Sequence, residues 1–589
     1  MADGLPVADP LLRPGRIGNV LVPNRVVFPP MTTRLADADG FVTADTLAYY
    51  GLRARHGVGL VTVEMASPER CGRHRFNELG IDDDRFLPGL AELAALIHLH
   101  GAKAAIQLGH GGGHTREDIS GEPPVAPSAI PHPVFERFDQ TVVPEAMSVA
   151  RIRACVDAFA AAAVRARRAG FDAVDVHAAH GYLISQFLCP VENRRDDAYG
   201  GSLENRARFA VEIIRAIKDA VPDLAVIFRQ NGDDFVPGGM TAEEAVEVAV
   251  MAEAAGADAI HVTAGHYRSE PSPRIMIPPM HEGEGPFVRF ARAVKARVTV
   301  PVIAVGRLGD PVRARAVLEE AAADFVALGR PLLADHEWVA KVRAGRTVRR
   351  CLGCNSCVDG MRAGDRLHCI VNPVTGRERA FTDTPPIQGE RILVIGAGPA
   401  GLSYAALLAP GNHVVVIERT QTPGGSLHWA GRAPLYQNVP TEPAALEAYV
   451  ASLTGAAVEL GVEIRYGVDI LREPEVVRRF DRVVIATGAA YRFGLGPPIR
   501  AALRLSSRAP GPWRRLLAHP ALRALFYHRL RRPTGDEVRR RLAPHLAPGA
   551  SIEVLGDAAR PGKTGPAVLS AFRAAFASVP ALDGDIAGA

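Results

Sequence analysis

The stretch DAFAAAAVRARRAGFDAVDVHAAH, residues 157–180, contains a helical pattern followed directly by a strand pattern. Its first half mixes alanines and other apolar residues with arginines at helical spacing, and the later run AVDVHA has the length of a strand. An amphipathic helix that leads into a buried strand is the repeating unit of a parallel sheet with crossover helices. This stretch therefore predicts an α/β fold.

The same alternation extends in both directions, from residue 25 to about residue 335. Eight apolar runs are separated by longer helical patterns: VVFPP, GLVTVEM, AKAAIQL, DAVDVHA, AVIFRQ, DAIHVTA, PVIAVG and DFVALG. Eight parallel strands with crossover helices close into a (β/α)8 barrel of the TIM type. Functional side chains in that fold follow the carboxyl ends of the strands, so the residues that end each run are candidates for a site.

Several runs end in residues that suit a flavin mononucleotide (FMN). The seventh and eighth runs end in Gly306-Arg307 and Gly329-Arg330, and the third and fifth carry Gln107 and Arg229. Glycine lets backbone N–H groups approach a phosphate and arginine offers it a guanidinium fork. Gln107 would pair with the pyrimidine edge of the flavin, and Arg229 would stabilise the negative charge of the reduced ring. Taken singly, each side chain could equally be a hydrogen bonder within its loop.

Residues 351–369 read CLGCNSCVDGMRAGDRLHC and place four cysteines in a short segment. Thiolates at this spacing suit an iron–sulfur cluster or tetrahedral zinc. Because nucleotide-binding patterns flank the segment on both sides, an electron-carrying cluster is the favoured interpretation and a structural zinc site is the alternative. The predicted metal ligands are Cys351, Cys354, Cys357 and Cys369.

A dinucleotide-binding pattern begins at RILVIGAGPAGLSYAA, residues 391–406, where GxGxxG follows an apolar strand directly. The helix that starts in such a loop presents its N-terminus to a pyrophosphate, and Glu418 is placed to bind a ribose hydroxyl. The predicted contacts in this part of the chain are Gly396, Gly398, Gly401, Glu418 and Gly425.

Three further stretches are NRVVFPPMTT at 24–33, QLGH at 107–110 and HAAHGYLISQFLCPVENRRDDAYGGSLENR at 177–206. They resemble the old yellow enzyme family. With the cysteine motif and the dinucleotide pattern, the arrangement is similar to the multidomain branch that includes bacterial 2,4-dienoyl-CoA reductase and trimethylamine dehydrogenase. This resemblance implies FMN, a 4Fe-4S cluster and a bound FAD or ADP, with NAD(P)H as a candidate reductant.

By this resemblance, Pro30, Met31 and Thr32 lie at the FMN, and Gly556 and Asp557 contact the ribityl and pyrophosphate part of FAD. Thr32 stands where trimethylamine dehydrogenase attaches its flavin to a cysteine, so a flavin held without a covalent bond is expected.

The resemblance also implies roles for three residues after the fourth run. His177 and His180 would hold the carbonyl oxygen of an activated alkene, and Tyr182 would protonate the α-carbon after hydride transfer from FMN. Two imidazole donors aimed at that oxygen would stabilise the enolate charge as it develops. The alternative is that this triplet only packs a strand-to-helix turn.

The loop after the sixth run, TAGHYRSEPSPR, supplies the candidate substrate contacts His266, Tyr267 and Arg268. These residues either line a substrate pocket or brace the loop. Dienoyl-CoA reductase has a histidine in the position of Arg268, which argues against a dienoyl-CoA substrate.

Between the ATG motif and the final GD motif there is no second GxGxxG, so no complete NADPH-binding unit is expected there. The arginine-rich residues in this region either dock an acidic electron carrier, such as a ferredoxin or electron-transfer flavoprotein, or form a solvated helical hairpin. The predicted organisation is an FMN barrel at 1–345, a cluster segment at 346–385, a dinucleotide-binding domain at 386–495, a basic helical insertion at 496–548 and a return to the dinucleotide-binding domain at 549–589.

The composition excludes some classes of partner. A net charge of +4 is too small to predict nucleic acid binding. No apolar stretch approaches the length of a membrane span, so no membrane partner and a cytoplasmic location are expected. Whether the chain forms a homo-oligomer stays open.

Three functions are consistent with the sequence. The favoured one is an ene-reductase that acts on a small activated alkene, with electrons relayed through the cluster. The second is an amine dehydrogenase, N-demethylase or desaturating dehydrogenase that passes electrons out through the cluster to a protein acceptor. The third is a degenerate electron-transfer module. Tyr182 and the two histidines favour the first function, and the missing NADPH unit favours the second.

Overall fold

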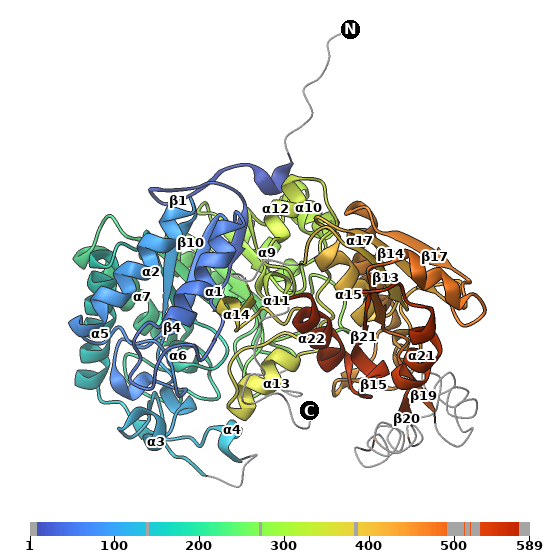
Figure 1. The fold of residues 1–589 in the computed structure, drawn as a ribbon. Coiled ribbons are helices and arrows are strands. Elements are labelled where there is room, and N and C mark those ends of the chain that lie inside the picture. Colours follow the sequence, from blue (N-terminus) through green and yellow to red (C-terminus); the bar gives the residue numbers. More distant parts are fainter. Residues whose placement is uncertain are drawn as a thin grey trace. The chain divides into compact units, whose positions relative to one another are not determined.

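The computed structural model describes residues 9–136, 141–269, 274–381, 387–491, 512, 519 and 531–576. The chain divides into two compact units, shown in Figure 1. The first holds residues 1–278, 282–332 and 360–367, and the second holds 279–281, 333–359 and 368–589. The predicted cluster segment 346–385 is therefore divided between them. Most of the predicted insertion 496–548 lies outside the described residues.

The first unit is a closed barrel of eight parallel strands. The neighbouring strands around the barrel are β10 (Ala259–Thr263), β11 (Val302–Val305), β12 (Phe325–Ala327), β3 (Val26–Phe28), β4 (Leu60–Ala66), β5 (Lys103–Leu108), β8 (Ala173–Ala178) and β9 (Ala225–Asn231). Each strand coincides with one of the eight apolar runs of the sequence. The predicted (β/α)8 barrel is confirmed.

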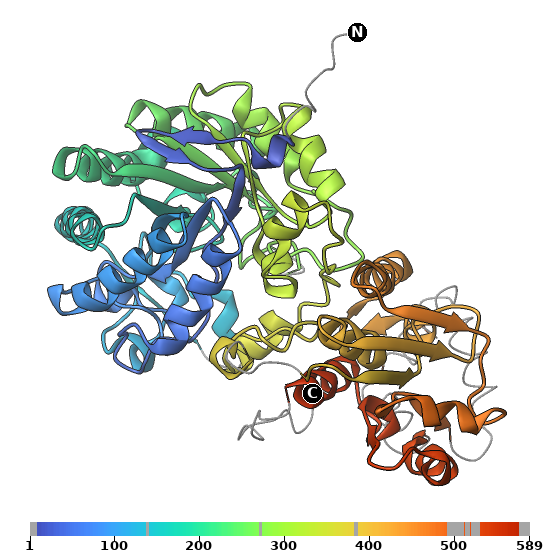
Figure 2. The same ribbon diagram turned by 45° about the horizontal axis from the view of Figure 1, so that its top comes forward.

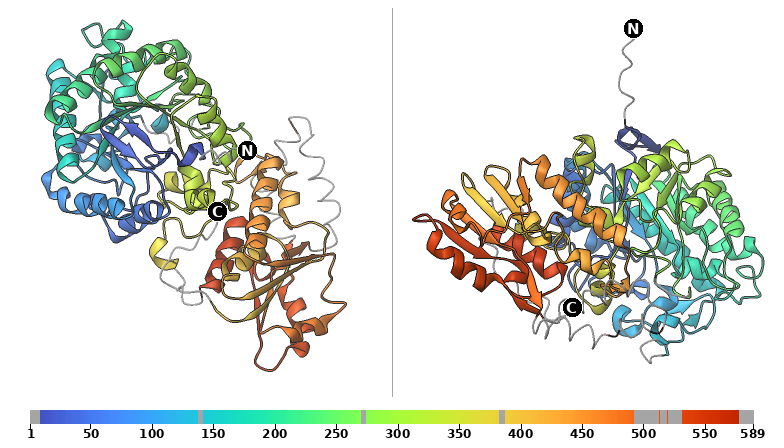
Figure 3. Two further views of the ribbon diagram at one scale, coloured as in Figure 1. Left: turned by 90° about the horizontal axis from the view of Figure 1, so that it is seen from above. Right: turned by 90° about the vertical axis from the view of Figure 1, so that its right-hand side faces the viewer.

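Helices surround the barrel strands (Figure 3). They are α1 (Ala44–Arg55), α2 (Leu87–Leu99), α5 (Val149–Arg168), α7 (Leu203–Ala220), α8 (Ala242–Ala254), α9 (Val288–Lys295) and α10 (Pro311–Glu319). Helix α5 shows why these segments are helical. The Ser148 side chain accepts a hydrogen bond from the Arg151 N–H at its start, and arginines fill its last turn, where positive charge is favourable.

One end of the barrel is filled by apolar side chains. The hairpin of β1 (Gly15–Ile17) and β2 (Val20–Val22) packs against residues near the starts of the strands, among them Leu60, Ala225 and Phe325. Because this cluster is apolar and buried, it holds the fold together and offers no chemistry. The polar residues lie at the opposite, carboxyl ends of the strands.

The second unit contains a parallel sheet of five strands in the order β17-β14-β13-β18-β21 (Figure 2). Their bounds are β13 (Arg391–Ile395), β14 (His413–Glu418), β17 (Glu463–Tyr466), β18 (Arg482–Ile485) and β21 (Ser551–Val554). The chain starts in the middle of the sheet, builds outward in one direction and then crosses to the other side. This is the strand order of a Rossmann-like fold, as the sequence predicts.

Both faces of this sheet are buried. Ile392 and Val394 belong to the apolar cluster shared with α15 (Pro399–Leu408), α17 (Pro443–Glu459) and α22 (Thr564–Ala575), whereas Leu393 and Ile395 belong to a second cluster with α21 (Gly535–Leu542). Strand side chains alternate between the two faces, so the four buried residues Ile392–Ile395 are all apolar, and the charged Arg391 lies exposed at the start of β13.

The remaining elements are short. The helices are α3 (Glu117–Ser120), α4 (Pro133–Glu136), α6 (Leu183–Leu188), α11 (Gly329–Ala334), α12 (Trp338–Arg343), α13 (Ser356–Ala363), α14 (Glu378–Phe381) and α16 (Leu427–Ala430). The strand pairs are β6 (Val125–Ala126) with β7 (Glu145–Ala146), β15 (Leu435–Tyr436) with β16 (Val439–Pro440), and β19 (Ala489–Tyr491) with β20 (Arg531–Pro533). Across the described ranges, the helices are either too short or too polar to cross a bilayer.

Candidate active site

A buried polar layer crosses the carboxyl end of the barrel. Gln107 on β5 donates its Nε2 to Asp175 Oδ1 on β8 at 2.7 Å. His261 Nδ1 on β10 lies 3.2 Å from the other oxygen of Asp175. Burial and the neighbouring Arg229 lower the pKa of His261, so the ring is neutral and its Nδ1–H donates to Asp175. The carboxylate thereby fixes the orientation of the Gln107 amide.

Arg229 lies between His177 and His261, because the three residues are in register on adjacent strands. Its Nε has no hydrogen-bond partner among the described residues, and the same holds for His177 Nδ1 and His261 Nε2. Burial lowers the pKa of Arg229, opposed by the charge of Asp175. Buried polar atoms without partners are costly, so this end of the barrel is suited to a polar ligand. The donors fit the polar edge of a flavin.

The glycine and arginine pairs after β11 and β12 are placed for close backbone approach. Gly306 has φ +111°, and a Cβ added there would lie 2.8 Å from the Phe287 ring. A Cβ on Gly329 would lie 2.8 Å from the sulfur of Met31. The loops after the first and last strands therefore meet, which brings the predicted Pro30-Met31-Thr32 segment to the predicted phosphate loops. Arg330 donates to the Pro278 carbonyl at 2.8 Å, and Arg307 has φ +50°.

The structure brings the predicted triplet together, with His177 on β8 and His180 and Tyr182 in the loop that follows it. The His177 ring centroid lies 5.2 Å from that of His180 and 4.9 Å from that of Tyr182. His180 is held with φ +66° by a 3.2 Å hydrogen bond from its N–H to Asn231 Oδ1, and its Nε2 lies 3.0 Å from Thr263 Oγ1. A histidine in this left-handed conformation is strained, and such strain is common at functional sites. Burial lowers the pKa of both histidines, so both rings are neutral.

Tyr182 makes two hydrogen bonds through its hydroxyl. The oxygen lies 3.1 Å from His74 Nε2 and 3.2 Å from the Tyr267 hydroxyl. Glu78 Oε2 lies 2.7 Å from Nδ1 of the same histidine, which favours the ring proton on Nδ1 and leaves Nε2 as an acceptor. Burial and the neighbouring Tyr267 raise the pKa of Tyr182 well above its usual value. The phenol is therefore protonated at neutral pH.

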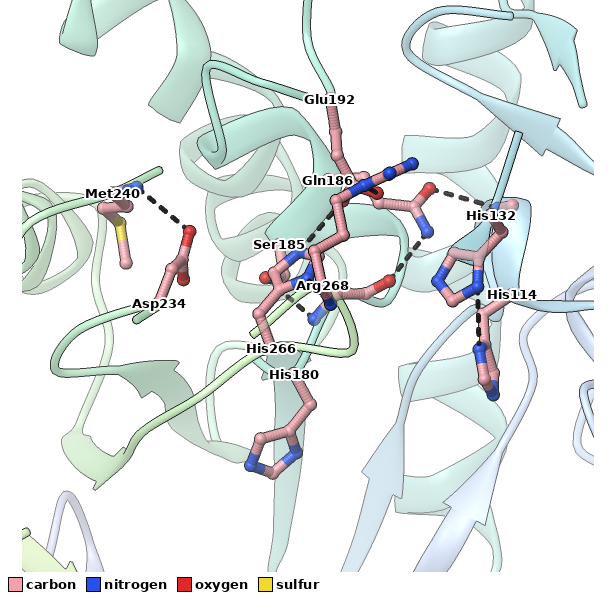
Figure 4. Close-up of polar contacts among 12 residues, drawn as sticks. His114, His132, His180, Ser185, Gln186, Glu192, Asp234, Met240, His266 and Arg268 are labelled. Carbon is pink, nitrogen blue, oxygen red and sulfur yellow. Dashed lines mark hydrogen bonds and ion pairs between the residues drawn. The ribbon is translucent and has the colours of Figure 1, made fainter. Parts of the chain in front are cut away.

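The two other predicted substrate contacts, His266 and Arg268, interact with Glu192 rather than with Tyr182. His266 is fully buried, with Nε2 2.9 Å from Glu192, and Arg268 donates to the same carboxylate at 2.6 Å (Figure 4). The Arg268 backbone N–H donates to His266 Nδ1 at 3.1 Å, so the ring carries its proton on Nε2. These residues brace the loop on Glu192. Of the three predicted substrate contacts, only Tyr267 reaches Tyr182.

The cysteine segment contains four thiols, those of Cys351, Cys354, Cys357 and Cys369. Burial, followed by the charges of Cys351 and Cys354, raises the pKa of Cys369 to about 12, so these sulfurs are near neighbours. Groups of three metal-ligand atoms within 4.8 Å of one another occur at two other places among the described residues, but not in this segment. The segment therefore offers four thiols that could serve as ligands of a metal centre.

The three glycines of the dinucleotide loop differ in how much space a side chain would have at each position. Gly396 has φ +113°, and a Cβ there would lie 2.5 Å from the Ala486 carbonyl oxygen. A Cβ on Gly401 would lie 2.0 Å from the Gly396 oxygen, whereas one on Gly398 would meet nothing within 4 Å. The first and third glycines therefore allow close packing, and the second leaves the backbone open. This is the geometry of a pyrophosphate loop at the N-terminus of α15.

The other predicted contacts of this domain lie nearby. Glu418 Oε2 accepts from the Ala397 N–H at 2.9 Å, so the carboxylate supports the loop. Gly425 and Gly556 also approach it, since added Cβ atoms would lie 3.4 Å from Gly398 Cα and 3.0 Å from Ala400 Cβ. Asp557 lies beside Gly556, with its carboxylate 3.4 Å from Arg531 and accepting from the Gly562 N–H.

Residues 10–349 match the NADH:flavin oxidoreductase / NADH oxidase family, which is more than half of the chain. The chain belongs to this family. Residues 394–433 match the NAD(P)-binding Rossmann-like domain. The protein is therefore an FMN-dependent oxidoreductase with a second, dinucleotide-binding unit, and the multidomain old yellow enzyme resemblance of the sequence is confirmed.

Relatives of this flavin oxidoreductase include an NADH oxidase of Thermoanaerobacter brockii, 40% identical over 81% of this chain and 73% of that protein. A cinnamate reductase of Clostridium sporogenes is 33% identical over 82% of this chain and 74% of its own length. A solved 2-naphthoyl-CoA reductase complex has the same fold, with a TM-score of 0.84, 24% identity and coverage of 96% of this chain and 99% of that one.

Sequence reasoning missed His74 and Glu78 in this flavin oxidoreductase. They lie in the long loop after β4, in the stretch CGRHRFNE, which matches no motif. The available signal was their position, because polar residues that follow a barrel strand at its carboxyl end are candidates for the site. The loop after the second apolar run, GLVTVEM, is therefore where the sequence could have indicated these two residues.

A buried carboxyl group lies beside the predicted flavin loop. Glu64 on β4 accepts hydrogen bonds from the N–H and the hydroxyl of Thr33, the residue after Thr32. Burial raises the pKa of Glu64 from 4.5 to about 8, although the Thr33 hydrogen bonds oppose the shift. The contribution of the Glu64 carboxyl group to the free energy of unfolding is therefore fully present below pH 4.5, and it is lost as the pH rises through about 8.

We expect the free energy of unfolding of the Glu64→Gln variant to rise relative to that of the wild type as the pH rises from 5 to 9. One pKa unit corresponds to about 1.4 kcal/mol, so the difference should reach several kcal/mol. Thermal unfolding of both proteins across this range measures the difference. A constant difference would show that Glu64 does not change its charge on unfolding.

Proposed function

We propose that the chain is an ene-reductase that reduces an activated C=C bond of the α,β-unsaturated carbonyl type. The observation that carries this proposal is the meeting of two neutral imidazoles, His177 and His180, with the protonated phenol of Tyr182 at the carboxyl end of the barrel. The similarity to a protein named cinnamate reductase supports the same class of reaction.

In this proposal, His177 and His180 donate hydrogen bonds to the carbonyl oxygen of the substrate. Donors that are already oriented stabilise the enolate charge as it develops and need no reorganisation during the reaction. Gln107, Arg229 and the loops at Gly306-Arg307 and Gly329-Arg330 would hold FMN. Bound there, FMN supplies the hydride for the β-carbon.

Tyr182 then donates its proton to the α-carbon. The Tyr267 hydroxyl, 3.2 Å away, can donate to the resulting phenolate, and burial would otherwise make that charge expensive. His74 and Glu78 hold the phenol in place from the other side. A weak acid can serve as the proton donor here because the enolate carbon is basic.

Electrons would reach the barrel through the second unit. We propose that Cys351, Cys354, Cys357 and Cys369 hold a 4Fe-4S cluster rather than zinc, because the chain has a flavin-binding barrel and a dinucleotide-binding unit on either side of this motif. The dinucleotide loop would hold FAD or ADP, and the reductant is either NAD(P)H or a protein carrier such as a ferredoxin.

The Cys354→Ser variant is expected to lose the cluster and keep the FMN barrel, because the four cysteines lie in the second unit. Iron, acid-labile sulfide and FMN are measured in the purified variant and in a Cys155→Ser control, whose thiol is buried in α5. Zinc in place of iron in the wild type would refute the cluster, and loss of FMN with the cluster would show that the two units are interdependent.

The experiment that tests the function is anaerobic stopped-flow absorbance of the iron-reconstituted protein. The protein is mixed with NADH or NADPH and then with 2-cyclohexenone. Flavin bleaching by nicotinamide and recovery with the enone are the expected results. Bleaching by dimethylglycine or by a saturated ketone, without recovery by the enone, would instead support a dehydrogenase.

A further inference from the structure

Two guanidinium groups lie around the phenol ring of Tyr267. Arg362 Cζ lies 5.9 Å from the centre of that ring. His114 stacks on the same ring with centroids 4.0 Å apart and planes at 13°, and Arg75 lies 3.2 Å from Nε2 of this histidine. The Tyr267 hydroxyl in turn contacts Tyr182, and the charge of Arg75 acts on both phenols.

Among the described residues, no ion pair joins the guanidinium group of Arg75 or Arg362 to a carboxylate, although the charge of Glu78 acts on Tyr182. Glu78 contacts His74 and accepts from the backbone N–H of Arg75 rather than from its guanidinium. Burial and neighbouring cations lower the pKa of His114, so the partner of Arg75 is a neutral ring.

A third arginine adds to the same field. Burial and the charge of Arg75 lower the pKa of Arg34, and Asp365 opposes this shift. Arg34 donates to the Gly364 carbonyl at 3.3 Å, two residues from Arg362. Arg75 and Arg362 also lower the pKa of Tyr267 against the effect of its burial. The two guanidinium groups therefore favour a negative charge next to Tyr267, whereas Tyr182 beside it stays protonated.

We propose that Arg75 and Arg362 form an anion-binding subsite beside Tyr182 and Tyr267, and that the substrate is an α,β-unsaturated acid held as its carboxylate. This proposal rests on the proposed ene-reduction. One hydride from reduced FMN would add to the β-carbon and one proton from Tyr182 to the α-carbon, so that the C=C bond becomes a single bond. Tyr182 would regain a proton from solvent, and two electrons from NAD(P)H or from a protein carrier would reduce FMN again.

The chemistry explains why cations are needed. An unsaturated acid is already an anion, and hydride addition puts a second negative charge on its carboxylate group. Neutral imidazoles at His177 and His180 contribute only dipoles, whereas guanidinium groups contribute full charges and paired N–H donors. A neutral enone develops a single charge and does not need this subsite.

The test compares cinnamate with cinnamaldehyde, which have the same carbon skeleton and differ in charge. We expect Arg75→Met and Arg362→Met each to lower kcat/KM for cinnamate about 10- to 100-fold, with about a twofold change at most for cinnamaldehyde. Arg366→Met is the matched control, because Arg366 lies on the same segment but pairs with Asp45 at 2.9 Å. It should change neither value.

Binding is measured separately from turnover, by calorimetric titration of the holoenzyme with the product 3-phenylpropanoate and with 3-phenylpropanol. We expect the two variants to weaken binding of the acid only. Equal losses with cinnamate and cinnamaldehyde would overturn the subsite, as would a wild type that reduces cinnamaldehyde but neither binds 3-phenylpropanoate nor reduces cinnamate. If no alkene is reduced but acid binding depends on both arginines, the ene-reductase proposal fails and the anion subsite stands.

Discussion

Replacing Tyr182 by phenylalanine is expected to slow alkene reduction at least about 100-fold while flavin reduction by NAD(P)H stays unchanged. Only the oxidative half-reaction uses the phenolic proton. Phenylalanine keeps the ring in place between His177 and His74, whose centroids both lie 4.9 Å away. Anaerobic stopped-flow measurement of the two half-reactions, with cyclohexenone as the oxidant, separates the effects.

Tyr199→Phe is the matched control for this variant. The Tyr199 hydroxyl donates to Glu212 at 2.9 Å, outside the catalytic group, so its removal should leave both half-reactions unchanged. Tyr267→Phe should fall between the two, because it removes a donor to the phenolate but keeps the proton on Tyr182. Equal loss in both half-reactions of Tyr182→Phe would argue against its role as the proton donor.

The second large effect is expected from Gly401→Ala in the dinucleotide loop. The new Cβ would lie 2.0 Å from the Gly396 carbonyl oxygen, and neither backbone can move without separating α15 from β13. We expect the second unit to lose about 3 kcal/mol or more of its free energy of unfolding and to lose its bound nucleotide. Denaturant unfolding and nucleotide content of the purified protein measure both effects.

Gly398→Ala separates packing from ligand approach. A Cβ at this position meets nothing within 4 Å, so the stability of the second unit should not change. The methyl group would nevertheless occupy the place where a pyrophosphate approaches the loop, so nucleotide binding should weaken. If Gly398→Ala destabilises the unit as much as Gly401→Ala does, the assignment of the two glycines is wrong.

Much of the fold follows from local patterns. The eight apolar runs mark all eight barrel strands, and GxGxxG after RILVI marks the turn from β13 to α15. These features depend on residues within a few positions of one another, because strand length, helical spacing and loop glycines are local properties. The cysteine motif is local in the same way.

Part of the candidate site could not be predicted because its residues come from distant loops. The Tyr182 hydroxyl meets His74 across 108 positions and Tyr267 across 85 positions of the chain. His266 and Arg268 follow the same strand as Tyr267, yet both of these side chains contact Glu192 and not Tyr182. Which residue of a loop faces the site depends on partners elsewhere in the barrel.

The sequence by itself determined the architecture of the two units, the four candidate cluster ligands and the triplet His177, His180 and Tyr182. Only the tertiary structure decided that His74 and Tyr267 contact the Tyr182 hydroxyl, that Glu78 contacts His74, and that Arg362 lies over the ring of Tyr267 and Arg75 against His114. The physical reason is that closing a barrel brings the carboxyl ends of all eight strands together, so charges and hydrogen bonds act between residues far apart in the chain.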